Sequence, residues 1–89
     1  MNLDTILSIP PQVMSRLVDD ETVLLDLESG MYFGLDGVGK RIWESIEKGN
    51  SLGKTVELII SEFEVDEAQA QKDVIDFASE LVERGLLVN

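Results

Sequence analysis

The spacing of the apolar residues changes near Asp36, from a period of two before it to a period of about 3.6 after it. In the first part, alternating apolar residues predict three short strands, over residues 12–18, 22–27 and 31–35. The acidic turn at residues 19–21 joins the first two strands. The second turn contains Gly30, which adopts a positive φ without steric cost. Consecutive strands with tight turns predict an antiparallel meander.

Alternation also predicts which side chains of the second and third strands face the core, because successive side chains point to opposite faces of a sheet. Polar Asp26 and Glu28 mark the outward face of the second strand. The inward positions are then the alternate apolar ones: Val23, Leu25, Leu27, Met31, Phe33 and Leu35. The outward positions of the third strand are Tyr32 and Gly34.

The second part of the chain predicts three helices. Asp36, Ser51 and Asp66 are suitable N-caps, since each side-chain oxygen can accept a backbone N–H of the first turn. Gln69 would complete a capping box with Asp66, so the third helix is expected over residues 66–84. Trp43, in the first helix, is expected in the core, because so small a domain needs its large aromatic side chains inside.

These elements predict an α+β fold of the winged helix-turn-helix type, with a three-stranded antiparallel meander followed by three α-helices. The 89 residues are enough for one small core and therefore for one domain, 1–89. Residues 1–9 precede the first strand and are left open as a flexible segment.

The charge and the missing residue types exclude several functions. Lys and Arg number 7 against 18 Asp and Glu, a net charge of −11 that repels nucleic acid and anionic membranes. Without Cys or His, the chain lacks thiol nucleophiles, imidazole bases and structural zinc sites, and only hydroxyls, carboxylates, Lys and Tyr remain for chemistry. We therefore expect no enzyme, no metal and no cofactor. The chain shows neither a signal peptide nor a membrane-spanning run, which predicts a cytoplasmic protein.

The third strand is the first candidate for function. In a three-stranded meander it is an edge strand, and residues 30–35 contain no charge and no Pro to block the addition of another strand. An extended peptide could therefore pair with its backbone. Two other interpretations remain open: a helix or the end of the chain covers this edge, or the edge pairs with a second copy in a homodimer.

The predicted third helix carries acidic residues on one side. Asp73, Asp76, Glu80 and Glu83 are spaced so that they share a stripe opposite the apolar positions. The stripe is either a solvated helix face or a landing surface for a basic peptide. Phe77, with Tyr32 and Phe33 of the third strand, would supply aromatic contacts to such a peptide.

Ser51 offers a different function. Asn50-Ser51-Leu52 at the start of an acidic helix resembles the stretch around the phosphopantetheinylated serine of acyl carrier proteins. Asn50, however, replaces the Asp that normally precedes that serine, and the strands upstream replace the long first helix of that family. Ser51 is therefore interpreted first as a helix N-cap, with the acyl carrier as the alternative.

The run from Val23 to Asp36, the segment Gly39–Ile46 and the ending Gly85-Leu86-Leu87 together resemble the PqqD-like peptide chaperones. These proteins are also called precursor-peptide recognition elements of ribosomally made, modified peptides. The resemblance covers roughly residues 12–88. A free-standing chain of this size is similar to the versions in quinone-cofactor and lasso-peptide pathways.

The resemblance implies a non-catalytic domain to which the leader of a precursor peptide adds as a strand beside the third strand, in a groove against the third helix. Such domains deliver the precursor to a maturation enzyme, namely a leader protease, a macrocyclase or a radical SAM enzyme. The partners implied are thus a leader peptide and one such enzyme, with the chain itself a monomer or weak homodimer. Arg84 is a further candidate on the helix. The implied peptide-binding residues are Met31, Tyr32, Phe33, Gly34, Leu35, Asp73, Asp76, Phe77 and Glu80.

Overall fold

The computed structural model describes residues 1–89 and contains three strands followed by three helices. The antiparallel strands lie in the order β1-β2-β3, so the meander and the α+β fold are confirmed. No helix is both long and apolar enough to cross a membrane. The elements are β1 (Val13–Val18), β2 (Glu21–Asp26), β3 (Tyr32–Leu35), α1 (Gly37–Glu47), α2 (Leu52–Glu62) and α3 (Glu67–Glu83).

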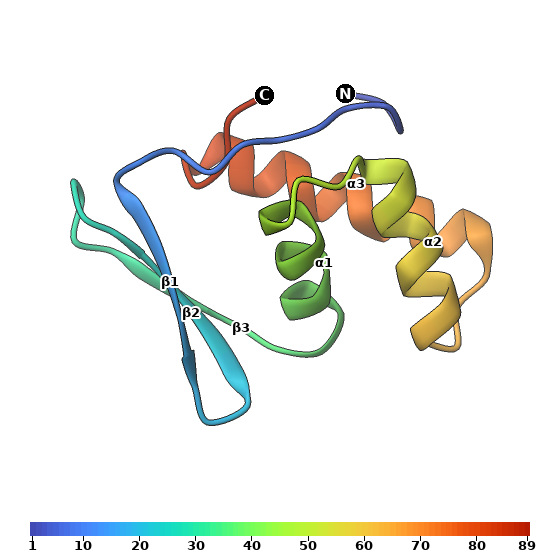
Figure 1. Cartoon of the computed structure of the whole chain (residues 1–89), viewed down its shortest axis with the longest axis horizontal. Helices are drawn as coiled ribbons and strands as arrows, with labels where there is room; N and C mark the ends of the chain where they lie inside the picture. The colour runs from blue at the N-terminus through green and yellow to red at the C-terminus, as the bar shows by residue number, and fades with distance from the viewer.

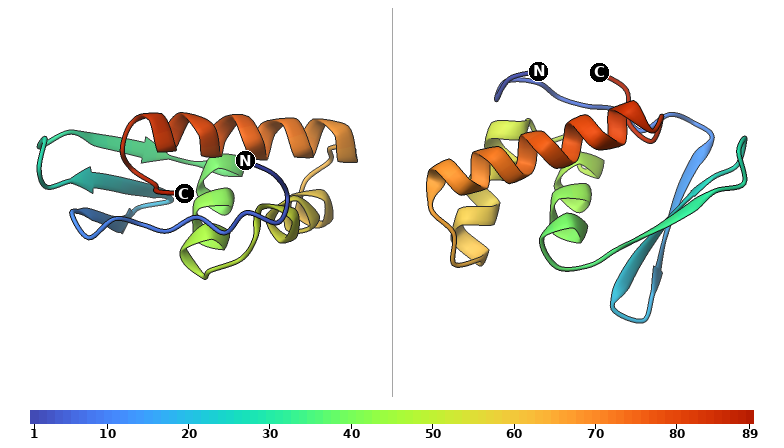
Figure 2. Two further views of the ribbon diagram at one scale, coloured as in Figure 1. Left: turned by 90° about the horizontal axis from the view of Figure 1, so that it is seen from above. Right: turned by 180° about the vertical axis from the view of Figure 1, so that it is seen from behind.

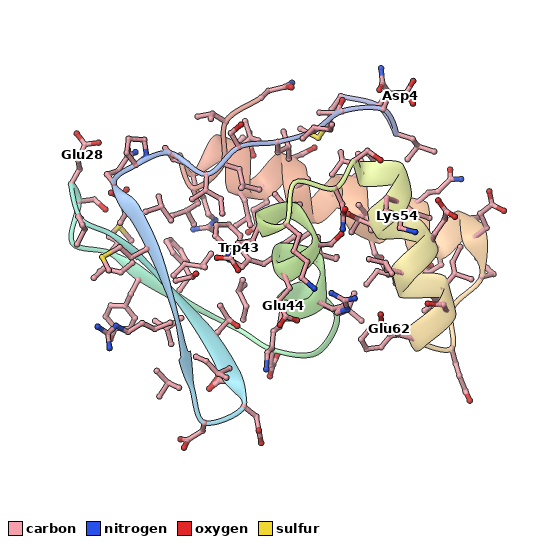
Figure 3. All side chains as sticks on the ribbon, viewed as in Figure 1. Asp4, Glu28, Trp43, Glu44, Lys54 and Glu62 are labelled. Carbon is pink, nitrogen blue, oxygen red and sulfur yellow. The ribbon has the colours of Figure 1, made fainter.

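All three helices lie on one side of the sheet, and its other face carries no helix (Figures 1 and 2). The core fills the space between the helices and the covered face. Trp43 of α1 is fully buried there, between its helix and the sheet (Figure 3), as expected. A sheet covered on one side only leaves the other face open to partners.

The covered face of β2 differs from the one predicted. Leu24 is fully buried and Thr22 nearly so, whereas Leu27 is exposed in the turn that follows. The prediction failed because Val23, Leu24 and Leu25 are all apolar, so that only Asp26 and Glu28, at the end of the strand and beyond it, indicated which face is outward. The Asp26 carboxylate instead accepts the Glu28 N–H at 2.9 Å, which makes it a turn residue.

In β3, Phe33 and Leu35 pack against the core as predicted. Met31 does not, because it lies before the strand and is exposed. Strand β3 begins at Tyr32, one residue later than expected. The outward positions of β3, Tyr32 and Gly34, are exposed as the alternation predicts.

The helix caps agree with the sequence at two of three places. The Ser51 hydroxyl accepts the Lys54 N–H at 3.1 Å, and the Asp66 carboxylate accepts the Gln69 N–H at 2.8 Å. The Asp36 side chain makes no capping hydrogen bond, although Asp36 occupies the N-cap position of α1. Gly37 follows it with φ +54°, so the chain enters α1 through a turn that needs glycine.

After a turn at residues 2–5, the rest of the first nine residues crosses the helices as an extended segment (Figure 1). Leu7 is buried in the core, and Ser8 exchanges two backbone hydrogen bonds with Val88, both 2.9 Å long. The carbonyls of Leu3 and Thr5 accept the N–H groups of residues 53 and 52 at the start of α2. The segment therefore supplies partners that the first turn of a helix otherwise lacks.

Candidate peptide-binding site

The backbone of β3 has a free side. The Met31 carbonyl accepts the Asp26 N–H of β2 at 2.9 Å, and the orientation of backbone groups alternates along a strand. Phe33 therefore directs its backbone groups toward β2, and Tyr32 and Gly34 direct theirs away from it. Since β3 is the last strand of the sheet, these two residues present N–H and C=O groups for a further strand.

Helix α3 lies beside this edge (Figure 2). The Arg84 guanidinium stands over the Phe33 ring, 5.1 Å from its centroid. Farther along, the Phe77 ring lies against α1, only 3.1 Å from where a Cβ on Gly39 would be. As the chain runs from Phe33 to Gly39, the contacting residues of α3 run back from 84 to 77. The C-terminal half of α3 is therefore antiparallel to the chain that runs from β3 into α1, with Arg84 facing β3 and Phe77 facing α1.

The acidic residues of α3 lie along two different sides of the helix. Asp73 and Glu80 share the spacing of Phe77 and Arg84, so they lie on the same side of α3 as those two residues. Asp73 is half-buried and accepts the Gln69 side-chain N–H at 2.7 Å. Glu80 accepts two N–H groups from Arg84, at 3.1 and 3.2 Å.

Asp76 lies farther round the helix, in solvent. Its carboxylate pairs with the Lys72 ammonium at 2.6 Å, and this hydrogen bond raises the pKa of Lys72 above its ordinary value. Glu83, seven residues after Asp76, shares its line and is exposed. The predicted acidic stripe is thus only partly beside β3.

The aromatic residues predicted to contact the peptide lie on two different sides of the sheet. Phe33 and Phe77 lie on the helix side of the sheet. Tyr32 pairs with Leu25 on the bare face and is 73% exposed. Gly39 is a site residue that the sequence analysis missed, and the signal was a glycine inside a predicted helix, where close approach of a neighbour is a common reason.

Ser51 has the geometry of a helix cap. Its hydroxyl is engaged by the Lys54 N–H, and the segment at residues 3–5 covers the start of α2 through the two hydrogen bonds described above. This arrangement explains the serine without any modification.

Comparison with known proteins identifies the family of this chain. The family model described as Coenzyme PQQ synthesis protein D (PqqD) matches residues 21–87. The chain belongs to the PqqD family. The resemblance seen in the sequence is therefore confirmed. None of the curated proteins matches.

Two solved structures resemble this PqqD-family chain over nearly its whole length. "TbiB1 in Complex with the TbiA(beta) Leader Peptide" is 43% identical, with a TM-score of 0.84 over 89% of this chain and 92% of the other. "Lasso peptide synthetase B1 complexed with the leader peptide" is 26% identical, with a TM-score of 0.89 over 96% of this chain and 100% of the other. Both similar proteins are thus described in complex with a leader peptide.

Proposed function

We propose that this PqqD-family chain binds the leader of a ribosomally made precursor peptide as an added strand beside β3, against the C-terminal half of α3. The free backbone of Tyr32 and Gly34 carries the proposal, because it offers two residues' hydrogen-bonding groups on an edge without charge or Pro. The leader complexes of the two similar proteins support the same kind of ligand.

The side chains around the edge indicate how a leader is selected. Side chains of an added strand alternate, so half of them would face α3 and meet Phe33 and Phe77. Asp73 and Glu80 lie on the same side of α3 and would favour Lys or Arg in the leader. The backbone hydrogen bonds tolerate many sequences, and these side chains would provide the specificity.

The chain would hold its ligand and leave the chemistry to a partner. It has no Cys or His, and the proposed site contains no arrangement of nucleophile and base. We infer that it delivers the bound precursor to a maturation enzyme, and that the encounter occurs in the cytoplasm, where the precursor is synthesised. The lasso peptide synthetase B1 similarity favours a lasso-type pathway, with a leader protease and a macrocyclase as the enzymes.

Fluorescence anisotropy with labelled leader peptides encoded beside the gene tests the proposal. A leader that adds as a strand loses affinity when N-methyl groups block the alternate amides that face β3, and keeps it when the other amides are methylated. Amide chemical shifts of Tyr32 and Gly34 should move on binding. If none of these leaders binds the wild-type chain, the proposed function is wrong.

Two variants of the chain add a side-chain test. Phe33→Lys places a charge against the added strand and should weaken leader binding by about tenfold or more, a typical loss at a central contact. Ile60→Lys changes a partly exposed apolar residue of α2 and should leave leader binding unchanged. Sedimentation of the free chain examines the remaining alternative, a dimer through the β3 edge. A dimer that dissociates when leader is added would indicate that the leader and the second copy compete for the β3 edge.

A further inference from the structure

The bare face of the sheet is apolar. Its middle holds a hollow of about 260 Å³ between β1, β2 and β3. Met14, Val18 and Tyr32 are 45%, 50% and 73% exposed there. The lining consists of five apolar side chains and one basic one: Met14, Val18, Val23, Leu25, Tyr32 and Arg16.

This lining differs from that of an ordinary solvated sheet face. In an antiparallel sheet covered on one side, the open face usually carries the polar residues of the alternation. Here the open face of β2 carries Val23 and Leu25, opposite Arg16 and Met14 of β1. Contiguous exposed apolar surface of this kind marks an interaction site.

Charge determines which partner fits the face. Residues 12–36 contain one basic side chain, Arg16, and six acidic ones, for a net charge of −5. The acids stand at or beyond the ends of the strands; Figure 3 shows Glu28, which lies beyond the end of β2. The acidic residues are Asp19, Asp20, Glu21, Asp26, Glu28 and Asp36.

Two copies of the chain placed face to face would bring these acidic turns together. Each whole chain carries −11, so self-association through this face works against repulsion. A partner with apolar side chains framed by Lys and Arg would gain both burial and attraction. A carboxylate of that partner could pair with Arg16, the one basic group in the hollow.

We propose that the bare face of the sheet is the docking surface for the maturation enzyme, which presents apolar side chains within a basic frame. The identity of the partner rests on the proposed function. A leader strand beside β3 would continue the same face, because half of its side chains would stand next to Tyr32. The enzyme would then contact the sheet and the leader together and would bind the loaded chain more tightly than the free one.

The test measures binding of the purified leader protease and macrocyclase encoded beside the gene, with and without leader. The variant Met14→Gln/Val18→Gln makes the hollow polar without changing charge, at two exposed positions where folding tolerates it. We expect the affinity for one enzyme to fall about tenfold or more, while the leader affinity stays within about twofold.

Leu17→Gln is the matched control. Leu17 lies between the two substituted positions on the same strand and is 68% exposed, but its side chain is on the opposite face. It should leave enzyme binding unchanged. Addition of leader should tighten enzyme binding to the wild-type chain, and enzyme should tighten leader binding by the same factor.

Several results would overturn the proposal. One is enzyme affinity that is equal for wild type and the double variant, and another is no binding of either enzyme with or without leader. A third is a wild-type dimer in sedimentation that the double variant abolishes, since a second copy would then occupy the face. Each of these can occur while the leader binds normally, whereas failure of the proposed function appears as absence of leader binding itself.

Discussion

Neighbouring residues of β3 serve different surfaces. Phe33 faces the core and lies under the Arg84 guanidinium, whereas Tyr32 and Gly34 stand on the bare face and direct their backbone groups to the open edge. A single peptide strand beside β3 would therefore make side-chain contacts on both faces of the sheet. Separate substitutions of the adjacent residues Phe33 and Tyr32 can distinguish the contacts on the two faces.

One ion pair connects two helices, and it gives a prediction for pH. The Arg41 side-chain Nε–H of α1 donates to both carboxylate oxygens of Glu62 at the end of α2, at 2.8 and 3.0 Å; Figure 3 shows Glu62. This hydrogen bond, together with the charge of Arg41, holds the pKa of Glu62 below its ordinary value of 4.5.

We predict that Glu62→Gln changes how stability depends on pH. Because the pKa is lower in the folded state, the contribution of Glu62 is fully present above about pH 5.5 and is lost as the pH falls through the folded pKa. The difference in free energy of unfolding between wild type and Glu62→Gln should be constant near neutral pH and shrink in acid. Urea denaturation from pH 7 to pH 3 measures it. A difference that grows in acid would contradict the assignment.

At the scale of elements, different sides of α3 face different surroundings. Val74, Ala78 and Leu81 are buried in the core. Arg84 stands over Phe33 of β3 and Phe77 lies against Gly39 of α1, and these two contacts fix the orientation of the helix. The acidic residues therefore lie in different surroundings although all belong to one helix.

We predict that neutralising the acids on the side of α3 that carries Phe77 and Arg84 weakens the binding of a basic leader, whereas neutralising the solvent-facing acid does not. Asp73→Asn and Glu80→Gln should each reduce affinity by about two- to fivefold at low salt, the range of exposed charge pairs. Asp76→Asn is the matched control, because its carboxylate pairs with Lys72 in solvent. Anisotropy titrations at two salt concentrations compare them. Equal losses for all three variants would mean that the acids act only through net charge.

At the scale of the whole molecule, the two ends of the chain close the structure. The segment before β1 pairs with Val88 through Ser8 and gives carbonyl partners to α2, and the termini lie on the same side of the molecule (Figure 1). A domain of 89 residues has a small core, so each buried residue contributed by the ends matters.

We predict that Leu7→Ala lowers the free energy of unfolding by about 2–4 kcal/mol, because the side chain is buried and its removal leaves a cavity. Ile6→Ala, at the adjacent exposed position, should cost under about 0.5 kcal/mol. Chemical denaturation measures both. Equal and small losses for the two variants would show that the segment is detached in solution, and leader affinity should be unchanged in either variant.

The sequence by itself determined the features that depend on neighbouring residues. The order of strands and helices follows from apolar spacing, and the caps at Ser51 and Asp66 from side chains that reach the backbone three residues away. The uncharged β3 edge was also visible, because charge and Pro are properties of the chain before it folds. These predictions required no knowledge of how the elements pack.

Only the tertiary structure decided which face of the sheet the helices cover and which side of α3 borders β3. Val23, Leu24 and Leu25 are apolar in succession, because one face of β2 lines the core and the other lines the exposed hollow. When both faces of a strand are apolar, the alternation cannot show which face lies in the core, since hydrophobicity is the only signal it carries. Packing of the helices buries one face and leaves the other exposed. It also places Arg84 over Phe33 across a long separation in the chain, a contact that no local pattern encodes.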